Sequence, residues 1–157
     1  MPDFLSIGKI DMRRILESVL LIMMIGGGFS GAYAVLMKLI QGGFPSWESY
    51  LVFVVSFLLY VYILVAGLIF AHNKANTKHL KLALLVQVPW LSTPFLYYQF
   101  SAGANFGTRV YESGVNSFGY LGNGFQIALH PNDPWAIGVN FVALALFLSV
   151  LKVSRSN

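Results

Sequence analysis

The sequence contains no cysteine, and charged residues make up only 10% of its 157 positions. Without cysteine the chain has no disulfide bond, thiolate metal site or thiol nucleophile. Soluble domains carry about 25% charged residues, so ten basic and six acidic side chains are too few to cover a water-soluble surface. Disorder requires low hydrophobicity and is excluded by a hydrophobic content of 57%. The composition indicates an integral membrane protein.

Sequence motifs for catalysis are also missing. The chain has no nucleophile with a neighbouring base, no metal-ligand spacing and no glycine-rich phosphate loop. The carboxylates of Glu48, Glu112 and Asp133 fall in connections that we expect outside the membrane, and they meet only if these connections fold together. We therefore expect no catalytic residue, no metal and no cofactor, and a membrane enzyme is the least favoured function.

Four apolar runs are long enough to cross a membrane, which takes about 20 mostly apolar residues in a helix. We predict an all-α membrane protein, a four-transmembrane-helix bundle that forms one integral membrane domain over residues 1–157. The predicted spans cover residues 15–39, 50–71, 80–100 and 135–152. The first run also resembles a secretory signal peptide, because Arg13 and Arg14 precede it, but its length favours an uncleaved span.

The basic residues predict the orientation of these spans, because cytoplasmic connections are rich in lysine and arginine. Only Lys38 and Arg109 fall on one side of the predicted bundle. The other side, which carries both termini and the remaining eight basic residues, is therefore predicted to be cytoplasmic. The eight basic residues on the other side are Lys9, Arg13, Arg14, Lys74, Lys78, Lys81, Lys152 and Arg155.

The small size, the absence of cysteine and the absence of any N-glycosylation sequon favour a bacterial inner membrane. The lipid bilayer is the first expected partner, because basic residues at span ends contact anionic head groups. Nucleic acid is not an expected partner, since the basic residues are divided among three short segments.

Small residues in the first run lie at helical spacing. Gly27 and Gly31 are four residues apart, as are Gly28 and Ala32, so they lie on adjoining stripes of one helix face. Small residues allow close approach of membrane helices. Three interpretations stay open: packing within the bundle, an interface between protomers, and a flexible hinge.

The third run is the most irregular. Pro89 and Pro94 are predicted to kink it, because each proline removes a backbone donor and clashes with the preceding turn. Gln87, Ser92 and Thr93 could bond the carbonyl groups that are freed. Kinked spans with polar residues at mid-depth are where transporters place their sites, so a ligand or pore site competes here with a purely structural kink.

Two further residues complete this tentative site. Trp90 lies between the two prolines, and Asn140 lies a short way into the fourth run. An amide in lipid needs a hydrogen-bonding partner, so Asn140 is expected to face another helix. Bonding within the bundle and contact with a substrate are both compatible with this pattern.

The connection over residues 101–134 is the least membrane-like part of the chain. Residues 108–112 and 125–129 read as short strands, while Gly114 and residues 122–124 read as turns. We predict a small β-hairpin-like extracytoplasmic cap between the third and fourth helices. The cap covers either its own bundle or the surface of a partner.

Two functions follow from these patterns. The first is a noncatalytic membrane subunit that forms a homo-oligomer or joins a larger complex through the small-residue face of the first span or through the cap. The second is an oligomeric channel or transporter with its site on the kinked third span, since four helices are few for a monomeric pathway.

Overall fold

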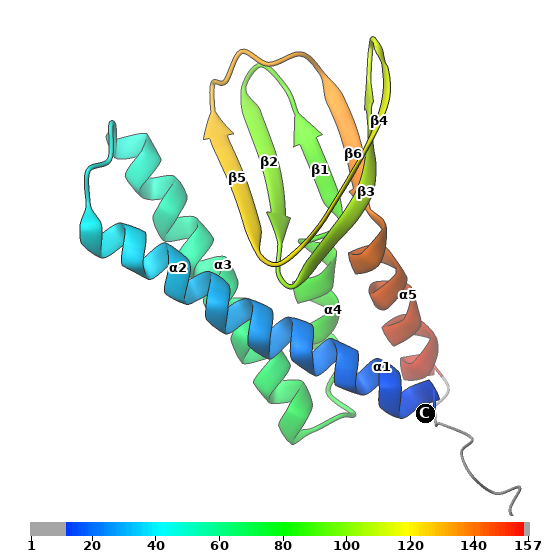
Figure 1. Ribbon diagram of the computed structural model, residues 1–157. Coiled ribbons are helices and arrows are strands. Elements are labelled where there is room, and N and C mark those ends of the chain that lie inside the picture. Colours follow the sequence, from blue (N-terminus) through cyan, green and yellow to red (C-terminus); the bar gives the residue numbers. More distant parts are fainter. Residues whose placement is uncertain (1–11, 156–157) are drawn as a thin grey trace, which may run out of the picture.

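The structure is a computed structural model that describes residues 12–155, and it combines helices with a large β-sheet (Figure 1). Four continuous helices and a six-stranded antiparallel sheet are present in this part of the chain. The predicted all-α bundle of four transmembrane helices is therefore wrong. Lys9 lies outside the described residues.

The first helix is long and changes its winding near its middle. It consists of α1 (Met12–Leu21), a π-helical stretch η2 (Ile22–Gly27) and α2 (Gly28–Gln41). The backbone then turns sharply, because Gly42 adopts φ 66°, which glycine accepts without steric cost. A π-helical turn rotates the following residues relative to an α-helix, and here it turns Met24 and Gly27 into the interior.

The second helix, α3 (Trp47–His72), runs back beside the first and completes a helical hairpin (Figure 1). Its start is capped by Ser46, whose hydroxyl oxygen accepts a hydrogen bond from the Ser49 backbone N–H at 3.2 Å. The predicted spans 15–39 and 50–71 fall within these two helices. Both are long and apolar enough to cross a membrane, by length and composition.

The two hairpin helices contact each other where side chains are smallest. A Cβ atom on Gly28 would lie 2.7 Å from the Leu64 backbone nitrogen, and one on Gly31 would lie 2.3 Å from the Tyr60 ring. Gly27 is equally close to the sheet, since a Cβ there would lie 2.8 Å from the Gly103 nitrogen. Ala32 is buried beside them. These small residues are therefore occupied by contacts within the chain.

Residues 80–100 do not form a third span. The helix α4 (Lys78–Leu85) ends after eight residues, and the chain continues as strands β1 (Pro89–Ser92) and β2 (Leu96–Ser101). Pro89 and Pro94 therefore kink no helix: Pro89 begins β1, and Pro94 lies in the connection to β2. The prediction failed because the apolar run was read as one helix, whereas its second half pairs with distant strands.

The predicted fourth span, 135–152, is likewise divided. Residues Ala136–Asn140 form strand β6, and the helix α5 (Phe141–Arg155) follows directly. The predicted cap over residues 101–134 is no separate lid either, because its strands join the sheet of β1, β2 and β6. These strands are β3 (Ala104–Tyr111), β4 (Gly114–Leu121) and β5 (Gly124–Leu129).

The sheet has the strand order β4-β3-β6-β1-β2-β5, and all its pairs are antiparallel. The two edge strands, β4 and β5, are consecutive in sequence and are joined by Gly122 and Asn123. Such a short link brings the two edges together at one end of the sheet. In Figure 1 the lower part of β4 passes across the front of the sheet, and the link lies at the lower end. The sheet is therefore curled, with one concave and one convex face.

Side chains from strands that are not neighbours meet across the concave face, which we call the inner face. The Tyr120 hydroxyl of β4 lies 2.9 Å from the Ser101 hydroxyl of β2. On the convex, outer face, the β2 and β5 side packs on the hairpin. The ring centroids of Phe100 and Tyr60 lie 4.7 Å apart, and those of Phe125 and Phe53 lie 5.1 Å apart. The core thus lies between the hairpin and one half of the sheet.

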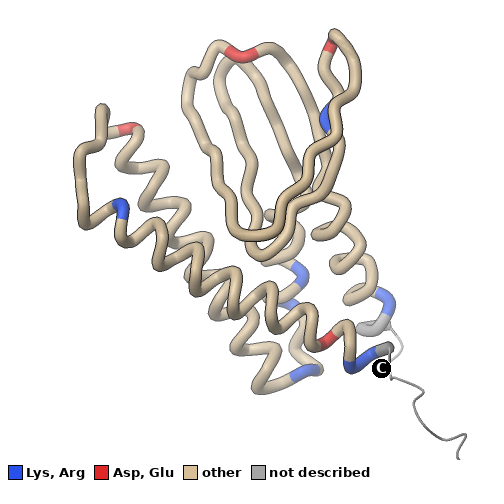
Figure 2. The backbone as a smooth tube through the Cα atoms, in the orientation of Figure 1, with Lys and Arg blue, Asp and Glu red and all other residues tan. Residues whose placement is uncertain are grey.

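Most charged residues lie toward the two ends of the molecule (Figure 2), while Arg109 lies within β3. Basic residues lie at the end where α1 begins, α3 runs into α4, and α5 approaches its C-terminus. The acidic residue at the start of α3 and those beyond the tips of the strands lie at the opposite end. The long middle of the hairpin carries no charge, because Lys38 is the first charged residue after Glu17.

The Tyr98 side chain fastens β2 to the end of α4. Its hydroxyl donates a hydrogen bond of 2.6 Å to the Val86 carbonyl oxygen. This bond links the strand to the C-terminal end of the helix.

We expect Tyr98→Phe to reduce the free energy of unfolding at pH 8 by about 1 kcal/mol, the net value of one hydrogen bond. Denaturant unfolding of both proteins in detergent measures this difference, and equal free energies of unfolding would contradict it.

Candidate functional site

The inner face of the sheet carries a cluster of polar side chains around Arg109, which we call the Arg109 cluster. The register of β1, β2, β3 and β6 places Trp90, Gln99 and Arg109 on this one face. The Arg109 guanidinium carbon lies 4.6 Å from the centroid of the Trp90 ring and 4.3 Å from that of Phe118. The cation is thus held between two aromatic rings, an arrangement that stabilises it.

Hydrogen bonds connect the members of the cluster on one side. The Arg109 Nη2 donates to the Gln99 Oε1 at 3.1 Å. The Tyr97 hydroxyl donates to the same oxygen at 3.4 Å and accepts a bond of 3.1 Å from the Trp90 indole nitrogen. Trp90, Tyr97 and Gln99 are all buried. These contacts fix the orientation of the guanidinium plane.

Tyr120 connects the other side of the cluster to the edge of the sheet. Its hydroxyl lies 2.9 Å from the Ser101 hydroxyl and accepts a bond of 3.1 Å from the Asn105 side-chain nitrogen. The Gln99 side-chain nitrogen lies within 3.5 Å of the same hydroxyl. Tyr60 of α3 reaches the same region, since its hydroxyl donates to the Ser101 carbonyl at 3.1 Å. This hydrogen bond links α3 of the hairpin to the strand that carries Ser101.

Two buried polar atoms in the Arg109 cluster have no hydrogen-bonding partner. They are the Asn105 Oδ1 and the Arg109 Nε. Arginine keeps its charge at any physiological pH, and the Arg109 side chain is partly buried. None of the ion pairs between described residues includes Arg109. The cluster therefore presents a partly exposed positive charge that lies against aromatic rings and that no carboxylate of the described residues neutralises.

The structure does not bring the residues of the tentative site together. Only Trp90 belongs to the Arg109 cluster. Gln87 lies between α4 and β1, where it donates to the Ala83 carbonyl at 2.8 Å and accepts from the Ala102 N–H at 2.8 Å. Ser92 donates to the Pro134 carbonyl at 3.1 Å. Thr93 organises the β1–β2 connection, and its hydroxyl oxygen accepts the Leu96 N–H at 2.9 Å. All four of these bonds are to backbone groups.

Asn140 lies at the junction of β6 and α5. Its Oδ1 accepts hydrogen bonds from the N–H groups of Val142 at 3.1 Å and Ala143 at 3.4 Å, as a helix N-cap does. The same oxygen accepts the Phe106 N–H at 3.4 Å, and the side-chain nitrogen donates to the Ala104 carbonyl at 3.4 Å. The side chain thus bonds α5 to β3.

Sequence reasoning missed most of the Arg109 cluster, including Arg109 itself. The signal was an alternation within residues 96–101: Tyr97, Gln99 and Ser101 point to one face, while Tyr98 and Phe100 point to the other. A period of two is typical of a strand with two different faces. The predicted span 80–100 places this stretch at the end of a transmembrane helix, in which an alternation of two has no structural consequence.

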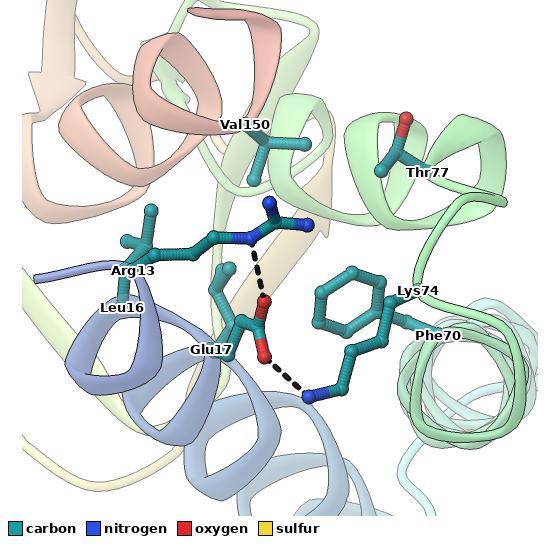
Figure 3. Close-up of a pocket in the computed structure, with 8 residues that line it drawn as sticks. Arg13, Leu16, Glu17, Phe70, Lys74, Thr77 and Val150 are labelled. Carbon is teal, nitrogen blue, oxygen red and sulfur yellow. Dashed lines mark hydrogen bonds and ion pairs between the residues drawn. The ribbon is translucent and has the colours of Figure 1, made fainter. Parts of the chain in front are cut away.

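A second group of charged residues lies at the basic end of the hairpin (Figure 3). The Glu17 carboxylate accepts a hydrogen bond from the Arg13 Nε at 3.1 Å and forms an ion pair with the Lys74 ammonium group of the α3–α4 turn. The Phe70 and Val150 side chains complete the walls of this small pocket. The carboxylate is already paired, so we interpret the group as a structural contact that holds α1 against the end of α3.

Among residues 12–155, no three side chains of the metal-binding types are grouped closely enough to hold a metal ion. The Arg109 cluster therefore remains the strongest candidate site. No protein-family model matches the chain, and neither a curated protein nor a solved structure matches it.

Proposed function

We propose that the protein is a noncatalytic membrane protein that binds an oxyanion, a carboxylate or phosphate group, through Arg109. In this proposal the helical hairpin holds the chain in the bilayer, with the basic end on the cytoplasmic side. The curled sheet then opens toward the other side. The observation that carries the proposal is the Arg109 guanidinium, clamped between two aromatic rings and without a carboxylate partner among the described residues.

The length and the exposed apolar surface of α3 support a membrane anchor. At about 1.5 Å per residue, the 26 residues of α3 extend for about 39 Å, which exceeds the roughly 30 Å of a hydrocarbon core. Only 28% of its most apolar window is buried against the rest of the protein. A core helix of a soluble protein is mostly buried, whereas less than a third of this window is buried. Lipid is the solvent in which such a surface is stable.

The choice of ligand rests on the geometry of the guanidinium. Arginine presents its donors in a planar fork that matches two oxygen atoms of a carboxylate or phosphate. The Trp90 and Phe118 ring centroids lie 4.6 and 4.3 Å from the guanidinium carbon. Gln99 occupies only the Nη2 side. The low dielectric of the surroundings strengthens the attraction to an anion.

Trp90 supplies a direct test, because its ring lies 4.6 Å from the guanidinium carbon. The chain has three tryptophans, so Trp47→Phe with Trp135→Phe leaves Trp90 as the only one. We expect inorganic phosphate or acetate to change its fluorescence in a saturable way. The affinity should fall at least tenfold in Arg109→Gln, a loss of about 1.4 kcal/mol or more. Arg109→Lys should restore little of it, because lysine lacks the fork.

Two controls make the titration decisive. Lys38→Gln removes a cation of the hairpin turn and should leave the affinity unchanged. Nanodiscs with and without phosphatidic acid distinguish a lipid head group from a free ion, since a head-group ligand responds to the lipid and not to added salt. Equal titrations of the wild type and Arg109→Gln, with both proteins folded by circular dichroism, would contradict the proposal.

A further inference from the structure

The curled sheet has the reverse of the usual polarity. Its inner face carries buried polar side chains, including Gln99, Ser101 and Asn105, beside the buried aromatic rings of Trp90 and Tyr97. The convex outer face carries apolar side chains on the half that the hairpin leaves uncovered. Register aligns Leu91, Ile137 and Val110 in one row across β1, β6 and β3. In water the apolar face of a sheet turns inward, whereas sheets in lipid have polar interiors and apolar exteriors.

The exposed part of this row is large and uncharged. Ile137 is 63% exposed and Val110 is 55% exposed. Their neighbours on the same face, Val139 and Thr108, are uncharged as well. The charged residues of this half of the sheet are Arg109, which points to the inner face, and Glu112 and Asp133, which lie beyond the strand ends. We call this surface, made of Leu91, Phe106, Val110, Ile137 and Val139, the outer apolar face.

The backbone beneath the outer apolar face is fully paired. β1 lies between β2 and β6, β6 lies between β1 and β3, and β3 lies between β6 and β4. Hydrocarbon tolerates only backbone whose polar groups are bonded internally, and these three strands satisfy that condition. The free edge falls on β4, which carries the exposed polar residues Asn116 and Ser117.

The position of the sheet also agrees with the depth of a bilayer. Contacts between Phe100 and Tyr60 and between Phe125 and Phe53 hold the sheet beside the half of the hairpin that is far from the basic end. At about 3.3 Å per residue, the five residues of β6 cover about 16 Å. This length equals about half of a 30 Å hydrocarbon core.

We infer that the outer apolar face lies against lipid acyl chains in the half of the bilayer opposite the basic end. The inner face is then a polar compartment within the membrane, enclosed on its outside by lipid. This inference rests on the membrane anchor of the proposed function and does not depend on oxyanion binding at Arg109.

The absence of cysteine allows single nitroxide labels at chosen positions. We would place them at Ile137→Cys and Val110→Cys on the outer apolar face, at Glu112→Cys beyond the strand end, and at Leu58→Cys on the exposed side of α3. In nanodiscs, oxygen reaches labels in lipid and a water-soluble nickel chelate reaches labels in water. Collision rates with both reagents are read from electron paramagnetic resonance.

We expect positions 137 and 110 to match position 58, with oxygen collisions several-fold more effective than nickel collisions, and position 112 to show the reverse. Nickel access at 137 and 110 equal to that at 112 overturns the inference and leaves the anchor standing. Protection from both reagents also overturns it, because a second copy or another protein then covers the face. Nickel access at 58 overturns the anchor and the inference together.

Discussion

Replacing Gly31 with alanine should destabilise the protein by about 3 kcal/mol, the upper end of what overpacking a core costs. The new methyl group would lie 2.3 Å from two carbons of the Tyr60 ring. Tyr60 is only 1% exposed and cannot move aside, since its ring packs on Phe100 and its hydroxyl bonds the Ser101 carbonyl. A shift of the Tyr60 ring would therefore also displace Phe100 and Ser101 of the sheet. Denaturant unfolding in detergent measures the loss.

Gly26 provides a matched control in the same helix. A Cβ at Gly26 meets no atom within 4 Å, so Gly26→Ala should be neutral or stabilising by about 0.5–1 kcal/mol, as glycine is a poor helix residue. In a Tyr60→Ala background the clash at Gly31 disappears, and Gly31→Ala should then cost little. Equal effects of Gly26→Ala and Gly31→Ala would show that the close contact with Tyr60 does not hold the hairpin together.

The second large effect is expected at Asn140. Asn140→Leu removes the helix cap of α5 and both bonds to β3, while leucine leaves the Phe106 N–H and the Ala104 carbonyl without their partner. The lost cap costs about 1 kcal/mol, and each buried group left unpaired costs about 1–3 kcal/mol. We expect a loss of about 3 kcal/mol or more in the free energy of unfolding.

A graded series separates the two roles of Asn140. Serine also caps helices, so Asn140→Ser should restore the cap and recover about 1 kcal/mol relative to leucine. The bond to the Ala104 carbonyl stays lost, because the serine side chain is too short to replace the amide. The free energy of unfolding should therefore be largest for the wild type, smaller for Asn140→Ser and smallest for Asn140→Leu. Serine and leucine variants of equal stability would contradict a capping role.

The helical hairpin was predictable because its signals are local. The charge-free stretch after Glu17, the turn near Gly42 and the Ser46 cap all act within a few residues of the helices that they delimit. The strands expected at residues 108–112 and 125–129 overlap β3 and β5 for the same reason. Local alternation and glycine turns mark them.

The rest of the sheet was not predictable, because its strands depend on distant partners. β1 pairs with β6, so that Trp90 lies opposite Gly138. Nothing within residues 80–100 reveals this pairing, and the apolar composition fits a membrane helix equally well. The same limit explains the site: the sequence singles out Trp90 by the two prolines around it, while Arg109 indicates only the orientation of the predicted spans. The pairing of β1 and β3 with β6 brings the two together, since both lie opposite Gly138.

The strand order also determines when the sheet can close during synthesis. β6 lies between β3 and β1, although it is the last strand of the chain. Before β6 leaves the ribosome, the earlier strands can form only two separate parts, β1-β2-β5 and β3-β4. The hairpin needs no such partner and can fold first. A nascent chain that stops before Ala136 therefore has its two helices paired and its inner face open, and the final strand converts two fragments into one compartment.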